Sequence, residues 1–118
     1  MARLSIRIDL DGSGRLGPGK IALLEAIAEH GSISAAGRAM NMSYRRAWEL
    51  VADLNARFAD PIVTTQGGGR RGGGARLTPF GTGLVERYRL IEREADAAVR
   101  RHLDAVEIAA RPGGSVIP

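Results

Sequence analysis

The 118-residue sequence contains no cysteine, only one lysine (Lys20), two histidines and few aromatic residues. The absence of cysteine excludes a disulfide scaffold, a zinc ribbon and thiol catalysis, and two histidines leave a metal site short of ligands. No apolar run approaches the roughly 20 residues that span a bilayer, and charged residues stand where a signal peptide has its apolar stretch. We therefore expect a single-domain, cytoplasmic protein that has no membrane contact, metal, cofactor or enzymatic activity.

Positive charge is concentrated in the middle of the chain. The sequence has 17 basic and 13 acidic residues, and all the basic residues except one are arginine. Residues 38–76 contain seven arginines and three acids, whereas residues 84–107 contain five arginines and six acids. Arginine can form two parallel hydrogen bonds with phosphate or with a guanine edge. This distribution predicts a basic surface on the middle of the chain and a balanced, solvated surface on its C-terminal part.

The first third of the chain predicts one strand and one helix. Residues 4–10 alternate strictly between apolar and polar, which is typical of a half-buried strand. Residues 11–17 are rich in glycine and predict a loop. Pro18 suits the first turn of a helix, apolar residues follow at helical spacing, and Gly31 ends the pattern.

Two further helices are predicted before the middle of the chain. Ser34 is a candidate N-cap for a short helix that reaches Met40, and Asn41 occupies a position that suits a left-handed turn. Ser43 is the next candidate N-cap. The helix behind it ends before Asp60 and carries an apolar stripe of Ala47, Val51, Leu54 and Phe58.

A hairpin and a long helix complete the pattern. Residues 62–66 and 75–78 predict two strands joined by a tip that is almost entirely glycine. Residues 82–110 predict a helix whose apolar stripe resembles a coiled-coil seam. The expected fold is α+β, mainly α: a short N-terminal strand, a winged helix-turn-helix over residues 1–80, a long dimerisation helix over 81–110 and a disordered tail over 111–118. The seam residues are Leu84, Tyr88, Ile91, Ala95, Ala98 or Val99, His102 or Leu103, and Val106.

Residues 12–20 match two phosphate-binding fingerprints, G-x-G-x-x-G and G-x-x-x-x-G-K. A phosphate-binding loop requires serine or threonine after the lysine, and this chain has Ile21 there. The dinucleotide version requires a second parallel strand about 20 residues further on, where this sequence predicts a helix. A nucleotide-binding enzyme is therefore the weaker alternative, and a glycine-rich turn before a helix is the stronger one.

The helix that begins behind Ser43 holds the main candidate binding residues. At about 100° per residue, Arg45 and Glu49 point away from the apolar stripe, and Arg46 flanks them. The N-terminal turn of a recognition helix reaches base edges, where arginine suits guanine and glutamate suits cytosine. The alternative is a solvated face on which Arg45 and Glu49 form an i, i+4 ion pair. The predicted DNA-binding residues of this helix are Ser43, Tyr44, Arg45, Arg46 and Glu49, while Trp48 is expected to pack against the hairpin or a neighbouring helix.

The glycine-rich tip supplies the second group of candidates. Arg70 and Arg71 lie in the middle of residues 67–74, the other six of which are glycine. Such an arm suits contact with a phosphate backbone or insertion into a minor groove, although a charged loop without function is the alternative. Arg76, at the base of the hairpin, is a third candidate for contact with phosphate.

Four stretches of the chain resemble the N-terminal DNA-binding domain of ModE-type molybdate-dependent transcriptional regulators, which is related to the LysR-type winged helix. They are residues 17–20 (Gly-Pro-Gly-Lys), 31–36 (Gly-Ser-Ile-Ser-Ala-Ala), 42–50 (Met-Ser-Tyr-Arg-Arg-Ala-Trp-Glu-Leu) and 72–81 (Gly-Gly-Gly-Ala-Arg-Leu-Thr-Pro-Phe-Gly), within a similarity over about residues 4–100. The resemblance implies a homodimer joined through its terminal helices, with residues 43–49 in the major groove and the glycine wing beside it. Regulators of this type also carry C-terminal molybdate-binding modules, which these 118 residues do not include. The resemblance therefore does not imply molybdate sensing by these residues, and an effector would act through a separate partner or not at all.

These observations predict a homodimeric transcriptional regulator that binds a specific sequence in double-stranded DNA, with genes for molybdenum or oxyanion transport or cofactor synthesis as possible targets. The alternative is a protein–protein interaction module that uses the long C-terminal helix and has no specific DNA target.

Overall fold

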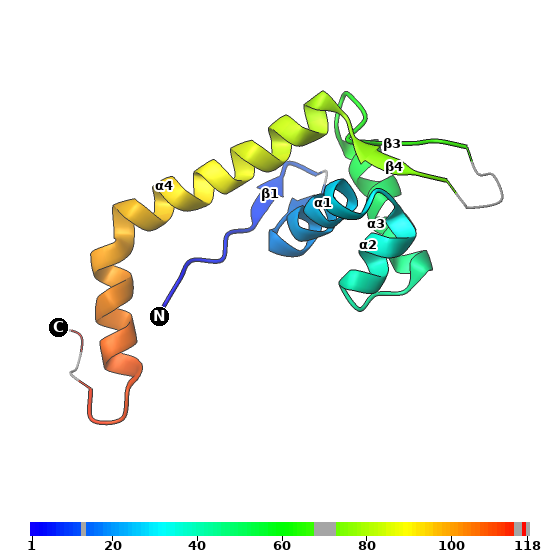
Figure 1. The fold of residues 1–118 in the computed structure, drawn as a ribbon. Helices are drawn as coiled ribbons and strands as arrows, with labels where there is room; N and C mark the ends of the chain where they lie inside the picture. The colour runs from blue at the N-terminus through cyan, green and yellow to red at the C-terminus, as the bar shows by residue number, and fades with distance from the viewer. Residues whose placement is uncertain (13, 68–72, 115–116, 118) are drawn as a thin grey trace.

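The computed structural model describes residues 1–12, 14–67, 73–114 and 117. It confirms the predicted fold class, because three short helices and a two-stranded wing are followed by a long C-terminal helix (Figure 1). The elements in chain order are β1 (Ile8–Leu10), β2 (Gly14–Leu16), α1 (Pro18–His30), α2 (Ile33–Ala39), α3 (Tyr44–Arg57), β3 (Val63–Thr65), β4 (Ala75–Leu77) and α4 (Pro79–Ala110).

The N-terminal region differs from its prediction. Only residues 8–10 of the expected strand 4–10 form a strand, and part of the expected loop 11–17 is the antiparallel partner β2, with Ile8 opposite Leu16. Residues before Ile8 are extended but have no neighbouring strand among the described residues, and the Ile6 carbonyl accepts a hydrogen bond from the Tyr88 hydroxyl of α4. The apolar–polar alternation was therefore real but came from an extended segment with one side on the protein. Alternation reports one-sided burial and does not supply a strand partner.

The core forms around α1. Ile21, Leu24 and Ile27 are completely buried, together with Leu23 on the same helix. Gly31 ends the helix as predicted: its φ of 74° is left-handed, and its N–H donates to the Ile27 carbonyl at 2.8 Å. The next buried residues come from α3 and from the segment that follows it, namely Ala47, Val51, Leu54 and Ile62. The apolar stripe predicted for α3 is thus the face that packs against α2 and joins the buried core, except that Phe58 lies one residue beyond the end of α3 and is half-buried.

The turn between α2 and α3 brings the two helices close together. The predicted cap of α2 was wrong: Ser32, not Ser34, accepts a hydrogen bond from the Ala35 N–H at 3.0 Å. The reason is burial, because Ile33 and Ala36 face the core and require the helix to begin at Ile33. At Gly37 an added Cβ would lie 3.1 Å from the Cβ of Ala47, so a larger residue there would push α2 away from α3. Asn41 adopts the predicted left-handed conformation, with φ of 55°.

The wing is attached to the helices at its base. β3 and β4 are antiparallel, with Val63 opposite Leu77, and the Ala75 N–H donates to the Gly31 carbonyl at 2.8 Å. The side chain of Asn55 on α3 accepts from the N–H groups of Ile62 and Val63 at 2.8 and 3.1 Å, and it donates to the Val63 carbonyl at 3.0 Å. These bonds determine where the wing lies relative to α3.

α4 begins at Pro79, three residues before the predicted start, because Thr78 caps it by accepting from the Gly81 N–H. Its first half packs on the body through Val85 and Tyr88, and its second half extends away from the body and bends (orange in Figure 1). The N-terminal segment runs back along that half, where Arg100 donates to the Ala2 carbonyl at 2.7 Å. The predicted seam therefore divides: Tyr88 belongs to this chain's own core, whereas Val106 is exposed. No helix among the described residues combines the length and apolarity needed to cross a membrane.

Beyond α4, the structure describes residues 111–114 and 117 of the predicted tail. The Gly114 N–H donates to the Arg111 carbonyl at 2.8 Å, which closes a turn directly after the helix.

Candidate nucleic-acid interface

The N-terminal turn of α3 is held by its cap. Ser43 has an extended backbone, and its hydroxyl oxygen accepts from the Arg46 N–H at 3.0 Å, as the sequence predicted. Ala47, Val51 and Leu54 are buried against the core, so the helix cannot rotate about its axis without exposing them. The opposite face is consequently presented to solvent.

That outward face carries the charged residues predicted from the sequence. The side chain of Arg45 is 89% exposed, and those of Arg46 and Glu49 are also mainly exposed. The Arg45 Nε lies 3.0 Å from a Glu49 carboxylate oxygen, which is the ion pair that the alternative interpretation expected. An exposed pair of this kind is worth only a few tenths of a kcal/mol, because solvent screens it. The ion pair therefore does not prevent Arg45 from contacting a ligand.

The two carboxylates on α3 have different surroundings. Asp53, towards the C-terminal end of the helix, accepts hydrogen bonds from Arg57, and the Lys20 ammonium lies 3.6 Å away. The hydrogen bonds from Arg57, helped by the nearby positive charges, lower the pKa of the Asp53 carboxyl. Charge is thus neutralised within the C-terminal half of α3. The N-terminal half has two arginines and one glutamate and is net positive.

Tyr44 and Trp48 form an exposed aromatic pair on the flank of α3. Their rings meet edge to face with centroids 6.1 Å apart. Trp48 remains 38% exposed and Tyr44 59% exposed, which is unusual for the only tryptophan of a small domain. Trp48 was expected to pack against the hairpin or a neighbouring helix. Instead it forms a wall of an open pocket that the hairpin and α2 also line.

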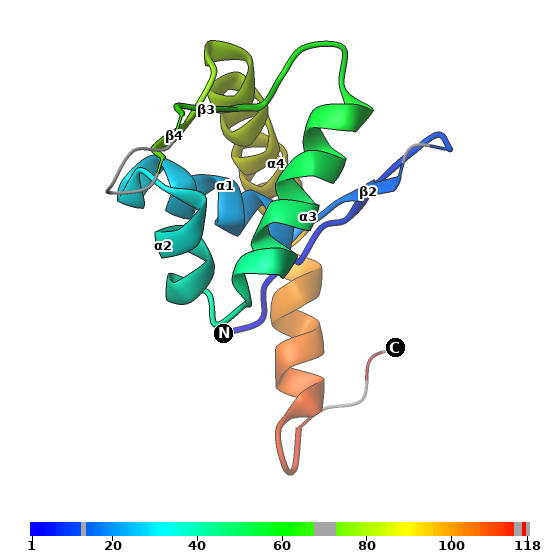
Figure 2. The ribbon, with the colours of Figure 1, turned by 90° about the vertical axis from the view of Figure 1, so that its right-hand side faces the viewer.

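The wing lies on the same side of the molecule as the N-terminal half of α3. Both are at the right of Figure 1, and both face the viewer in Figure 2, with α4 behind them. Arg76 is exposed on β4 opposite Thr64. Arg70 and Arg71 lie outside the described residues, so their predicted contact with DNA stays a prediction. Sequence and structure thus agree on a basic helix face and a wing base that point in one direction.

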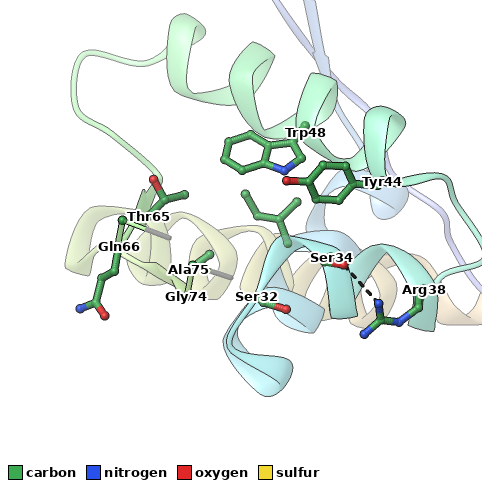
Figure 3. A pocket seen from close by; sticks show the side chains of 12 residues that line it. Ser32, Ser34, Arg38, Tyr44, Trp48, Thr65, Gln66, Gly74 and Ala75 are labelled. Atoms are coloured by element: carbon green, nitrogen blue, oxygen red, sulfur yellow. Dashed lines mark hydrogen bonds between the residues drawn. The ribbon is translucent and has the colours of Figure 1, made fainter. Parts of the chain in front are cut away.

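A pocket of about 610 Å³ separates α3 from the wing (Figure 3). Trp48 and Tyr44 lie on one side and two serines of the α2 region on the other, with Arg38 and Gln66 at opposite ends of the view. The sequence did not single out this pocket, because its residues come from three separate elements. They are Ser32, Ile33, Ser34, Arg38, Tyr44, Trp48, Thr65, Gln66, Gly67, Gly73, Gly74 and Ala75.

The described residues of the glycine-rich segment, 12 and 14–20, do not have the geometry of a phosphate-binding loop. Residues 14–16 are a strand of an antiparallel hairpin and do not form a loop. The Lys20 ammonium donates to the Arg15 carbonyl at 2.6 Å and faces Asp53. The weaker alternative from the sequence, a nucleotide-binding enzyme, is therefore without a site among these described residues.

The three helices, the wing and the basic face together define the winged helix-turn-helix class. Residues 19–82 match the family described as bacterial regulatory helix-turn-helix protein, lysR family. Since the match covers more than half of the chain, the chain belongs to that family, which comprises transcriptional regulators and is not an enzyme class.

The curated relatives of this chain include proteins named MopA and ModE. The chain is 46% identical over 81 residues to the molybdenum-pterin-binding protein MopA of Rhodobacter capsulatus, covering 69% of this chain and 31% of MopA. It is 39% identical over 101 residues to the molybdenum transport protein ModE of Azotobacter vinelandii, covering 86% of this chain and 37% of that protein. The DNA-binding transcriptional dual regulator ModE of Escherichia coli is 38% identical over 74 residues, covering 63% of this chain and 28% of that protein. The chain therefore spans about a third of the length of these relatives, and the resemblance to ModE-type regulators is confirmed for that third.

Proposed function

We propose that this protein is a transcriptional regulator that binds a specific sequence in double-stranded DNA as a homodimer in the cytoplasm. One observation carries the proposal: the outward, net-positive N-terminal half of α3 and the wing lie on one side of the molecule (Figure 2). A recognition helix in the major groove and a wing on the neighbouring backbone need this arrangement.

The residues divide into two roles. Arg45 donates two parallel hydrogen bonds to guanine, Glu49 accepts a hydrogen bond from cytosine, and Arg46 lies beside them on the same face. Ser43 and Tyr44 are at the tip of the helix, where hydroxyls suit a phosphate oxygen or a base edge. Arg70, Arg71 and Arg76 contact phosphates from the wing. The first group sets sequence preference, and the second adds affinity for any sequence.

The homodimer uses α4. Beyond the part that packs on the body, this helix exposes apolar side chains that a second copy would cover, namely Leu90, Ile91, Val106 and Ile108. Two copies related by a two-fold axis would place their recognition helices on half-sites about one helical turn apart or a multiple of it. In this arrangement residues 1–80 form the DNA-binding domain and residues 81–110 form the dimerisation helix.

A first experiment separates DNA binding from the alternative in which α4 binds another protein. An electrophoretic shift with genomic DNA fragments at moderate salt should retard a subset of fragments. Arg45→Gln should weaken the free energy of DNA binding by on the order of 1–3 kcal/mol and relax the sequence preference at one base pair. Arg7→Gln, the same charge change at an exposed position of the N-terminal segment outside α3, the wing and α4, is the control. Preference is read by selection from a randomised duplex.

The wing variant tests the division of roles. Replacing Arg70 and Arg71 together by glutamine should weaken all sequences alike and make the dependence of affinity on salt less steep. If the wing variant changed sequence preference while Arg45→Gln did not, the assignment of the two roles would be wrong.

Two of the relatives are named for molybdenum transport and molybdenum-pterin binding, and these names indicate which genes to propose as targets. We propose that this protein controls genes for molybdenum or oxyanion transport or cofactor synthesis. Genome-wide mapping of its bound sites should find them upstream of such genes. Sites scattered without relation to these genes would contradict this part of the proposal.

A further inference from the structure

We infer that the pocket between α2, α3 and the wing receives one sugar-phosphate unit of the DNA backbone, with the phosphate at Arg38 and the sugar against Trp48 and Tyr44. This inference rests on the proposed function and adds residues to it. Arg38 and Trp48 are not among the individual DNA-binding residues predicted from the sequence.

The position of the pocket is the first argument for this inference. If α3 enters the major groove and the wing follows the adjacent minor groove, the strand that separates the two grooves must cross the space between α3 and the wing. The pocket occupies this space, since its lining combines Tyr44 and Trp48 of α3 with Thr65 and Gln66 of the wing (Figure 3). The backbone of one strand therefore meets the pocket wherever the helix and the wing are both engaged.

The positive charge of the pocket is the second argument. Among the described residues that line it, Arg38 is the only charged side chain, and no carboxylate in the described part of the chain pairs with it. One N–H of Arg38 donates to the Ser34 hydroxyl oxygen at 3.2 Å, and guanidinium has five N–H donors. Most of its donors therefore remain available to an anion. By contrast, Arg45 and Arg57 each contact a carboxylate.

The serine hydroxyls of the pocket remain available as hydrogen-bond donors, which is the third argument. Ser34 accepts from Arg38, and Ser32 accepts from the Ala35 N–H at 3.0 Å. A hydroxyl oxygen that accepts a hydrogen bond keeps its own hydrogen for donation. Arg38 and the two serines thus offer donors to phosphate oxygens without breaking the contacts seen in the structure.

The exposed aromatic pair, Tyr44 and Trp48, is the fourth argument. Tyr44 and Trp48 hold their edge-to-face contact while leaving much of both rings exposed. Exposed aromatic area of this kind is costly in water and is recovered when an apolar surface covers it. A deoxyribose has an apolar face and lies next to the phosphate. The pocket therefore has a charged end for phosphate and an apolar wall for the sugar.

The test uses the full chain and does not require the operator, because backbone contacts are independent of sequence. The affinity for a labelled mixed-sequence duplex of about 30 base pairs, roughly three helical turns, is measured at several salt concentrations for the wild type, Arg38→Gln and the control Arg7→Gln, an exposed arginine of the N-terminal segment outside the pocket and α4. The affinity of the wild type for duplex should fall between about 50 and 200 mM salt. In Arg38→Gln, which lacks one phosphate contact per protomer, this fall should be smaller by about 3.5-fold per protomer. Arg7→Gln should match the wild type, and Arg38→Lys should restore most of the salt dependence. Circular dichroism of each variant verifies folding.

Trp48 provides the second readout, since it is the only tryptophan in the chain. Its fluorescence should change when duplex is added, and inorganic phosphate at matched ionic strength should not reproduce the change. Equal salt dependence for Arg38→Gln and Arg7→Gln, or unchanged Trp48 emission with bound duplex, would overturn the inference while leaving the proposed function intact. A response to inorganic phosphate that duplex does not compete for would also overturn it and indicate a site for a free anion. If the wild type binds no duplex at all, the proposed function itself fails.

Discussion

Gly81 and Gly83 lie two residues apart at the start of α4, yet alanine should have opposite effects at the two positions. A Cβ at Gly81 would lie 2.2 Å from the Ile62 carbonyl oxygen and 3.0 Å from the carbonyl carbon, both of them backbone atoms. A Cβ at Gly83 would have nothing within 4 Å. The structure therefore offers a pair of identical substitutions in one helix that differ only in tertiary contact.

The magnitudes follow from three contributions. Alanine in place of glycine inside a helix stabilises by roughly 0.5–1 kcal/mol, which is the whole effect expected for Gly83→Ala. At Gly81 the new methyl must move α4 by about 1 Å to reach an ordinary carbon–oxygen separation of about 3.3 Å. Such overpacking costs about 1–3 kcal/mol, and the movement strains the hydrogen bond of 2.9 Å from the Thr78 N–H to the Ile62 carbonyl. The helix-propensity gain of roughly 0.5–1 kcal/mol offsets part of this cost, so Gly81→Ala should destabilise by about 1–2 kcal/mol.

The assay is urea unfolding followed by far-ultraviolet circular dichroism, with all variants at one protein concentration because association would shift the midpoint. The midpoint should fall for Gly81→Ala and rise for Gly83→Ala. A shift of both variants in the same direction would refute the packing of α4 on the base of the wing.

Two further predictions test contacts that hold the elements together. Asn55→Ala removes three hydrogen bonds from the buried backbone of Ile62 and Val63 and should lower the free energy of unfolding by about 2–4 kcal/mol. Asn55→Asp should be less damaging because it keeps the two acceptor bonds, and a change below about 0.5 kcal/mol for Asn55→Ala would contradict this prediction. Burial raises the pKa of the Tyr88 phenol above its usual value of about 10. The unfolded state therefore ionises first, and stability should decline as the pH rises above about 10. Tyr88→Phe should show a smaller alkaline decline in unfolding experiments, and an equal decline would show that Tyr88 is not its source.

Local patterns were sufficient for the elements of the recognition helix. Ser43 as the cap, the buried stripe of Ala47, Val51 and Leu54, and the outward position of Arg45 all follow from the period of a helix and the chemistry of its first turn. The left-handed residues Gly31 and Asn41 were also predictable, because few residue types tolerate that conformation. In each of these cases the determining interaction joins residues within one or two turns of each other.

Only the tertiary structure decided the features that join residues distant in the chain. It showed that residues 4–7 are extended along α4 without a strand partner, and that burial of Ile33 places the cap of α2 at Ser32. It likewise assembled the pocket from Arg38, Trp48 and Thr65, which belong to three elements. Sequence periodicity states which side of a segment is buried, but not what covers it, because that depends on how the segments pack together. For this protein, the sequence thus determined which residues face outward on the recognition helix, and the packing determined what lies beside them.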